Sequence, residues 1–120
     1  MPLSTKYLFV VSMDVAKDKE ALFNEVYDSE HVPLLLKVPG VKSVTRMKTE
    51  PASFNIGGER KVLDGGGMPT YVAMYEIESP DVLLTKEWAE AAEKGRWPSQ
   101  VRPYTTNRHH VVRKVISAAG

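Results

Sequence analysis

A tyrosine and a histidine lie one helical turn apart in the first half of the chain. Tyr27 and His31 are four positions apart, so on a helix both side chains lie on one face, in line with Phe23. The rest of that face is apolar and must be buried. An imidazole titrates near neutral pH, and a phenol can donate a hydrogen bond to a developing oxyanion. The spacing therefore predicts a site in which His31 and Tyr27 are the catalytic residues.

Pro33 gives His31 a second, structural interpretation. Proline has no N–H for the helix and disfavours helical geometry at the preceding residue, Val32. We expect the helix to kink or restart there and to leave backbone carbonyls free. His31 then either moves a proton on a bound molecule or caps those carbonyls, and both interpretations stay open at this point.

Four further side chains are candidates for binding a substrate, namely Asn24, Arg46, Tyr75 and Trp97. Tyr75 can act as a second phenolic donor beside Tyr27, although both rings also suit an ordinary core. Arg46 can hold a substrate carboxylate, or instead pair with a helix carboxylate at the surface. Asn24 and Trp97 can line a pocket, and Trp97 can equally pack against its own loop.

Other kinds of site are not favoured. The chain has no cysteine, which removes disulfides, thiolate nucleophiles and cysteine-bound metals. His109 and His110 are adjacent, so on a strand they point to opposite faces and cannot share a metal ion. The glycines at 65–67 lack the Lys-Ser/Thr of a phosphate loop. The basic run 108–114 lacks the interleaved aromatic residues of an RNA-binding surface and suits a solvated edge strand. We expect no metal and no cofactor.

Length and charge narrow the class of protein. With 120 residues the chain is expected to form one domain over 1–120. Its 16 basic and 15 acidic residues give a net charge of +1, which argues against binding to nucleic acid or to an anionic membrane. No apolar stretch approaches the roughly 20 residues of a membrane span, and the first residues do not resemble a signal peptide, so a cytoplasmic location is expected.

Strands and helices alternate along the chain and must position these side chains. Strands are indicated by alternating apolar residues, and helices by helical spacing with capping signals. The segment 50–69 is rich in glycine and proline and is expected to be a long mobile or functional loop with room for a short hairpin. The expected elements are strands over 6–14, 41–49, 70–78 and 104–116, and helices over 18–37 and 79–94, with an ordered loop over 96–103.

The order strand, helix, strand, strand, helix, strand predicts an α+β, ferredoxin-like βαββαβ fold with an antiparallel sheet and both helices on one face. The strands over 6–14 and 70–78 are apolar on both sides, so the face without helices would expose an apolar patch. We expect a second copy of the chain to cover that patch. The result would be a homodimer whose two sheets form a dimeric α+β barrel.

With these residues, the chain resembles the EthD-like family, named for ethyl tert-butyl ether degradation, of the dimeric α+β barrel superfamily. The resemblance covers nearly the whole chain. It rests on Phe23-Asn24-Glu25-x-Tyr27-x-x-Glu30-His31-x-Pro33-Leu34, on Val38-Pro39-Gly40-Val41 with Arg46, and on Ser79-Pro80, Trp88, Gly95-x-Trp97 and Val101-Arg102-Pro103.

The resemblance implies a small-molecule ligand and points to an enzymatic role. Relatives in the superfamily include cofactor-free isomerases of the muconolactone type, polyketide cyclases and quinone-forming monooxygenases, in which a histidine at the position of His31 is a candidate for the chemistry. The usual Asn-Glu-Trp-Tyr reads here as Asn24-Glu25-Val26-Tyr27, so no role of that tryptophan carries over. We predict a protein that binds a cyclic or aromatic oxygenated metabolite. The alternative is a non-catalytic binding or stress-associated dimer with a structural His31.

Overall fold

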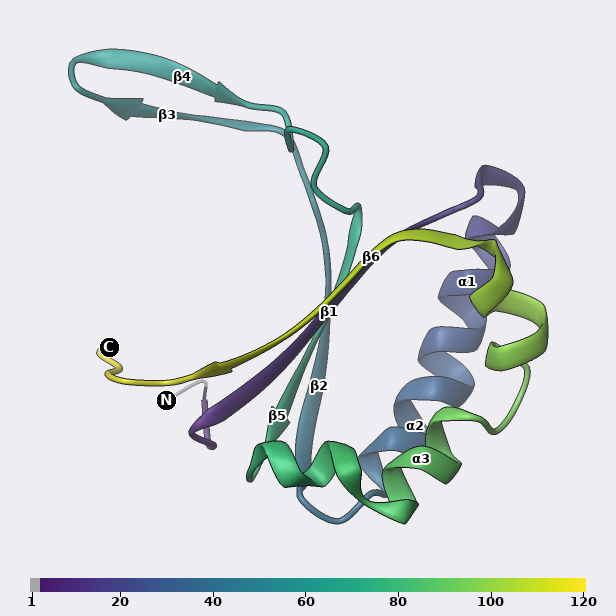
Figure 1. Ribbon diagram of the computed structural model, residues 1–120. Coiled ribbons are helices and arrows are strands. Elements are labelled where there is room, and N and C mark those ends of the chain that lie inside the picture. The colour runs from purple at the N-terminus through teal and green to yellow at the C-terminus, as the bar shows by residue number, and fades with distance from the viewer. Residues whose placement is uncertain (1–2) are drawn as a thin grey trace.

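The computed structural model describes residues 3–120. Figure 1 shows one sheet with helices packed against it and a separate hairpin that projects from it. The strands are β1 (Tyr7–Val15), β2 (Val41–Lys48), β3 (Ala52–Ile56), β4 (Glu59–Leu63), β5 (Tyr71–Ile77) and β6 (Thr105–Lys114), and the α-helices are α1 (Glu20–Val26), α2 (Val32–Leu36) and α3 (Lys86–Ala92). Shorter helical turns join or extend these helices.

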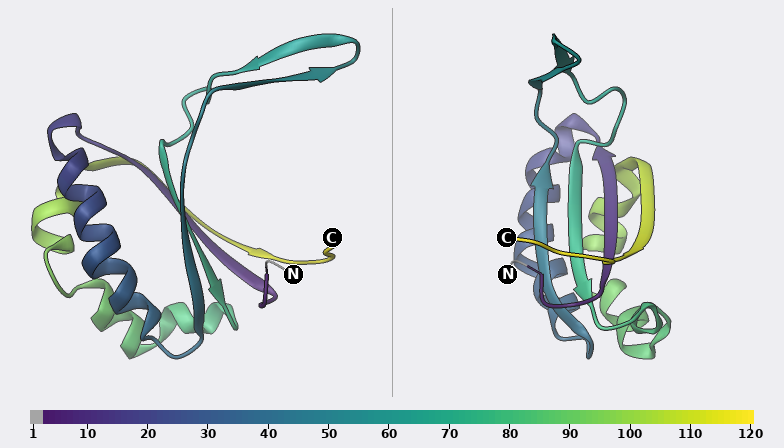
Figure 2. Two further views of the ribbon diagram at one scale, coloured as in Figure 1. Left: turned by 180° about the vertical axis from the view of Figure 1, so that it is seen from behind. Right: turned by 90° about the vertical axis from the view of Figure 1, so that its left-hand side faces the viewer.

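The main sheet has four strands in the order β2-β5-β1-β6, and every neighbouring pair is antiparallel. The helices lie on one of its faces (Figure 2). This arrangement confirms the predicted α+β class with an antiparallel sheet and is compatible with a ferredoxin-like fold. None of the helices formed by residues 3–120 is long and apolar enough to span a membrane.

The first helical segment is continuous through the position where a kink was expected. α1 passes into a π-helical turn, Tyr27–His31, in which the N–H of Val32 donates to the carbonyl of Tyr27, and α2 follows. Pro33 lies in the first turn of α2, where its missing N–H costs least. The helical course thus continues past Pro33 without a kink, and the change expected there takes the form of a wider turn followed by a new α-helical segment.

The prediction of a single helix over 79–94 is wrong. Ser79 accepts a hydrogen bond from the N–H of Asp81 and begins a 3-10 turn, Pro80–Leu84, as the sequence indicated. Thr85 is then extended, and its hydroxyl accepts a bond from the N–H of Trp88, so it caps a second start at α3. The segment after Gly95 is also more regular than the expected loop, with a π-helical turn over Trp97–Val101 and a 3-10 turn over Arg102–Tyr104.

The core lies between the helices and one face of the sheet. Its largest fully buried side chains come from both layers: Tyr75, Phe23, Leu35, Ile77, Val26 and Val101. Alternate residues of β1 and β5 point into this core. Tyr27 and His31, the two proposed catalytic residues on the first helix, therefore face the sheet and not the solvent.

Among residues 3–120, no helix lies over the other face of the sheet. In the right-hand view of Figure 2 the helices lie behind the sheet and none lies in front. Val10, Val72 and Met74 lie on this face and are only half-buried. β6 forms one edge of the sheet, as expected, and is exposed along all its residues except Thr105.

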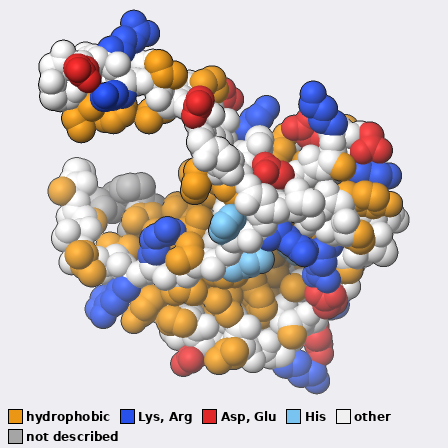
Figure 3. Space-filling model, turned by 45° about the horizontal axis from the view of Figure 1, so that its top comes forward, with side chains coloured by type: hydrophobic (Ala, Val, Ile, Leu, Met, Phe, Trp, Pro, Cys, Tyr) orange, Lys and Arg blue, Asp and Glu red, His pale blue; other side chains and the backbone are white. Residues whose placement is uncertain are grey.

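Within the expected loop over 50–69, β3 and β4 pair into a two-stranded arm. Its turn contains Gly57 and Gly58, both with positive φ, which glycine adopts at little cost. Every residue of β3 and β4 is exposed. The arm stands away from the body, and Figure 3 shows hydrophobic side chains in the hollow beneath it.

Candidate functional site

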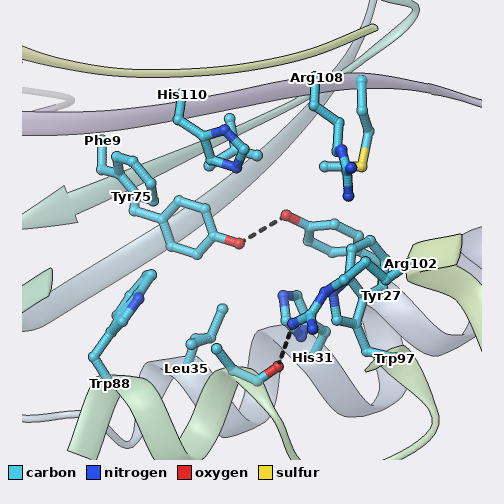
Figure 4. A pocket seen from close by; sticks show the side chains of 13 residues that line it. Phe9, Tyr27, His31, Leu35, Tyr75, Trp88, Trp97, Arg102, Arg108 and His110 are labelled. Atoms are coloured by element: carbon cyan, nitrogen blue, oxygen red, sulfur yellow. Dashed lines mark hydrogen bonds between the residues drawn. The ribbon is translucent and has the colours of Figure 1, made fainter. Parts of the chain in front are cut away.

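A cavity of about 170 Å³ opens between the first helical segment, α3 and the helix-covered face of the sheet. Figure 4 shows the side chains that line it. Four of the six predicted site residues line this cavity, namely Tyr27, His31, Tyr75 and Trp97. The structure thus brings together the two proposed catalytic residues and two of the four proposed substrate-binding residues.

The two phenols meet inside the cavity. The hydroxyl oxygens of Tyr27 and Tyr75 are 2.7 Å apart and share one hydrogen bond. Burial raises the pKa of Tyr27 to about 12 and raises the pKa of Tyr75 well above its ordinary value, so both phenols stay protonated at neutral pH. Each hydroxyl has one proton to donate, and only one proton is used between them. One O–H is therefore left for a bound molecule.

His31 is packed among aromatic rings. Its side chain stacks on Trp97 with ring centroids 4.5 Å apart and meets the edge of Tyr27 at 5.0 Å. The residue is 6% exposed, and within residues 3–120 its Nδ1 atom has no hydrogen-bond partner. A buried polar atom without a partner is unusual and costs stability. Nδ1 therefore does not make the carbonyl-capping bond that the structural interpretation requires of it.

The imidazole is held in its neutral form. The pKa of His31 is lowered to about 4, chiefly by burial and in part by the charge of Arg102, while the carboxylate of Glu93 acts in the opposite direction. At neutral pH one ring nitrogen therefore carries a proton and the other has a free lone pair. Such a ring can accept a proton from a bound molecule.

Three basic side chains at this cavity were not singled out as site residues from the sequence: Arg102, Arg108 and His110. Arg102 makes a two-pronged ion pair with Glu93, at 2.8 and 2.6 Å, and donates to the carbonyl of Ala92 at 3.1 Å. Arg108 and His110 come from β6, and Figure 4 shows both extending toward the cavity.

Arg108 and His110 could have been predicted from the way side chains alternate between the two faces of an edge strand. β6 was interpreted as a solvated edge, but alternate residues of an edge strand still point to the helix layer. His110 pairs with Val11, a core residue of β1, so its side chain lies on the helix-covered face. The adjacent His109 lies on the opposite face, in agreement with the argument that the two cannot share a metal ion.

Asn24 and Arg46 lie away from the cavity. Arg46 forms an ion pair with Asp28 at 2.8 Å and donates to the side-chain oxygen of Asn24 at 2.6 Å. Its guanidinium lies 4.8 Å from the centre of the Tyr27 ring. Pairing with a helix carboxylate was the alternative interpretation of Arg46, and this is the arrangement found.

The lining suits a planar organic molecule with oxygen atoms. Most of the lining is aromatic or aliphatic, and an apolar cavity of about 150 Å³ can hold a benzene ring. A cavity of about 170 Å³ therefore fits one six-membered ring with small substituents. Among residues 3–120, no three His, Asp or Glu side chains are grouped so that they could hold a metal ion.

In comparisons with known proteins, the chain matches no family model, and no curated protein or solved structure matches it at a significant level. The resemblance to the EthD-like family stays a prediction from the sequence.

Proposed function

We propose that this protein binds a small cyclic or aromatic oxygenated molecule in the cavity beside His31 and acts on it as a cofactor-free enzyme of the isomerase, cyclase or monooxygenase type. One observation carries the proposal: a largely apolar cavity is bordered by a buried, neutral imidazole whose Nδ1 has no hydrogen-bond partner among residues 3–120. The alternative, a non-catalytic binding or stress-associated dimer with a structural His31, would be favoured by a filled core and a histidine bonded to its own backbone.

The proposed chemistry is a proton transfer. The neutral ring of His31 takes a proton from a carbon next to a carbonyl of the bound molecule, and the electron pair of that C–H bond moves to form an enolate. The free O–H of the Tyr27–Tyr75 pair donates a hydrogen bond to the enolate oxygen. The imidazolium then returns its proton to another carbon, which completes an isomerisation. The negative charge on the substrate stabilises the imidazolium while it exists.

The first test compares ligand binding by the wild type, His31→Gln and His109→Gln. A panel of lactones, quinones and hydroxyaromatic acids is screened by thermal unfolding, because a ligand that binds only the folded state stabilises it, by about 2.7 kcal/mol at one hundred times its dissociation constant. We expect some ligands to stabilise the wild type and His109→Gln but not His31→Gln. His109 is the matched control since it lies on the opposite face of β6 from His110.

A second measurement separates binding from catalysis. Any ligand that binds is incubated with the protein in D₂O, and exchange of its C–H protons is followed by NMR. We expect exchange with the wild type and His109→Gln and none with His31→Gln. A ligand that binds the wild type without exchange or conversion would favour the non-catalytic alternative. If no member of the panel binds, the proposed small-molecule site is wrong.

We also propose that the protein is a cytoplasmic homodimer, with the helix-free face of the sheet at the interface. The half-buried apolar side chains of Val10, Val72 and Met74 on that face support this proposal. Val72→Lys is expected to reduce the mass measured by light scattering from dimer to monomer. Leu84→Lys, at a side chain that is 85% exposed elsewhere, should remain a dimer. A monomeric wild type at micromolar concentration would contradict the proposal.

A further inference from the structure

The two ends of the cavity differ in character. At one end Phe9, Tyr75 and Trp88 form an aromatic cluster, with ring centroids 5.6–5.8 Å apart in every pair. At the other end the guanidinium groups of Arg102 and Arg108 approach the cavity, as Figure 4 shows. A molecule that matched both ends would have a flat apolar part and a polar part on opposite sides.

The charged side chains that line the polar end of the cavity are both positive. Within residues 3–120 no Asp or Glu side chain lines the cavity, whereas two arginines do. The charge of Arg102 is already shared with Glu93. Arg108 forms no ion pair with any residue of 3–120, so its charge is available to a bound molecule. A guanidinium holds a carboxylate with two parallel hydrogen bonds.

The neutral groups of the site also favour a ligand rich in acceptors. The Tyr27–Tyr75 pair offers one O–H donor, and a neutral His31 offers one N–H donor. Together with the two arginines, the site therefore has more donors than acceptors. Such a site binds a ligand that brings oxygen acceptors and leaves donors unpaired when the ligand lacks them.

From this arrangement we infer that the ligand of the proposed site is a single-ring carboxylic acid, bound as its anion, with the ring against Phe9, Tyr75 and Trp88 and the carboxylate toward Arg108 and Arg102. The inference rests on the function proposed above and specifies its ligand class. It makes Arg108 a residue that determines specificity. The size of the cavity, about 170 Å³, limits the ligand to one ring.

Two probes of nearly equal shape test the inference: benzoate, which is an anion, and benzamide, which is neutral. Their dissociation constants are measured by NMR titration of the full chain. The variants are Arg108→Gln and its matched control Arg113→Gln, which removes the same charge from the same strand. Arg113 pairs with Leu8 and contributes to the helix-free side, where it borders a separate surface hollow. Both positions are exposed, so both variants should fold, and their melting temperatures check this. Because Arg113 lies on the face proposed as the dimer interface, light scattering checks that both variants keep the mass of the wild type.

We expect the wild type to bind benzoate about tenfold more tightly than benzamide. Arg108→Gln should weaken benzoate binding until the two probes are nearly equal and should leave benzamide binding unchanged. Arg113→Gln should behave as the wild type. Raising the ionic strength should weaken benzoate binding only.

Four results would overturn the inference. Equal binding of benzoate and benzamide by the wild type would refute the preference for an anion and leave the proposed small-molecule site standing. Equal losses in Arg108→Gln and Arg113→Gln would assign the preference to overall charge and not to this cavity. Acetate binding as tightly as benzoate would remove the role of the ring. If neither ring compound binds, both the inference and the proposed site fail.

Discussion

The neutral, buried His31 predicts a specific loss of stability in mild acid. In the unfolded chain a histidine has a pKa near 6.5, whereas burial against Trp97 and the nearby charge of Arg102 lower the pKa of His31 to about 4 in the folded protein. Between these two values the unfolded chain binds a proton that the folded protein does not. The free energy of unfolding therefore falls as the pH falls through this range.

The size of the effect follows from the two pKa values. Each pKa unit corresponds to about 1.4 kcal/mol, so the full contribution, reached only below the folded-state pKa, is about 3 kcal/mol. Between pH 7 and pH 5 the expected loss from His31 alone is about 2 kcal/mol. This is a large fraction of the total stability of a small domain.

The assay is urea unfolding followed by tryptophan fluorescence, at one protein concentration and at several pH values from 7 to 5. His31→Gln removes the titrating ring, and His109→Gln removes an exposed ring as the control. Carboxylates with lowered pKa, such as Glu30 and Glu76, also lose stability on acidification, but they do so equally in all three proteins. The difference between the wild type and His31→Gln isolates the histidine.

We expect His31→Gln to lose about 2 kcal/mol less than the wild type on going from pH 7 to pH 5, and His109→Gln to follow the wild type. A difference in the free energy of unfolding that is the same at every pH reports packing and does not enter the comparison. Parallel stability curves for the wild type and His31→Gln would refute the reasoning, because they would mean that His31 titrates alike in both states.

Two further predictions concern stability. Tyr27→Phe and Tyr75→Phe should each lower the free energy of unfolding in urea by about 1–3 kcal/mol, because each leaves a buried hydroxyl without its partner 2.7 Å away. The double variant should lose less stability than the sum of the two single losses, and strictly additive losses would contradict a shared hydrogen bond. Gly95→Ala should destabilise the protein more than Gly58→Ala does. Both glycines have a positive φ, which costs an alanine about 1–2 kcal/mol, but only at Gly95 would the new Cβ meet another side chain, 2.7 Å from the carboxylate of Glu30. Equal melting temperatures for the two glycine variants would argue against that contact.

Local patterns were enough to predict most of the fold. Alternating apolar residues gave the four main strands, and the Ser79-Pro80-Asp81 start was placed correctly. The break at Thr85 was missed because a threonine in a helical pattern is compatible with both an internal and a capping position, and only the bond from Trp88 decides between them. The π-helical turn at Tyr27–His31 has no comparable local signal.

The site residues that lie on one helix were predicted, whereas those brought to the site by contacts between distant segments were not. Helical spacing alone placed Tyr27 and His31 on the buried face. Arg108 enters the cavity only because β6 pairs with β1, a contact between the two ends of the chain that local spacing does not encode. The ion pair of Arg46 with Asp28 also depends on a distant contact, because the way the helix crosses the sheet decides which carboxylate lies beside Arg46.

The β3–β4 arm has a consequence for the kinetics of amide hydrogen exchange. Both strands have every residue exposed, and within residues 3–120 no third strand lies beside them. Such a pair is only marginally stable in water, so its amides should exchange with solvent almost as fast as in an unfolded chain. The apolar side chains of Phe54, Ile56 and Val62 are exposed on this arm. Slow exchange at its amides would therefore reveal that another molecule rests on the arm, and its dependence on protein concentration would tell whether that molecule is a second copy of the chain.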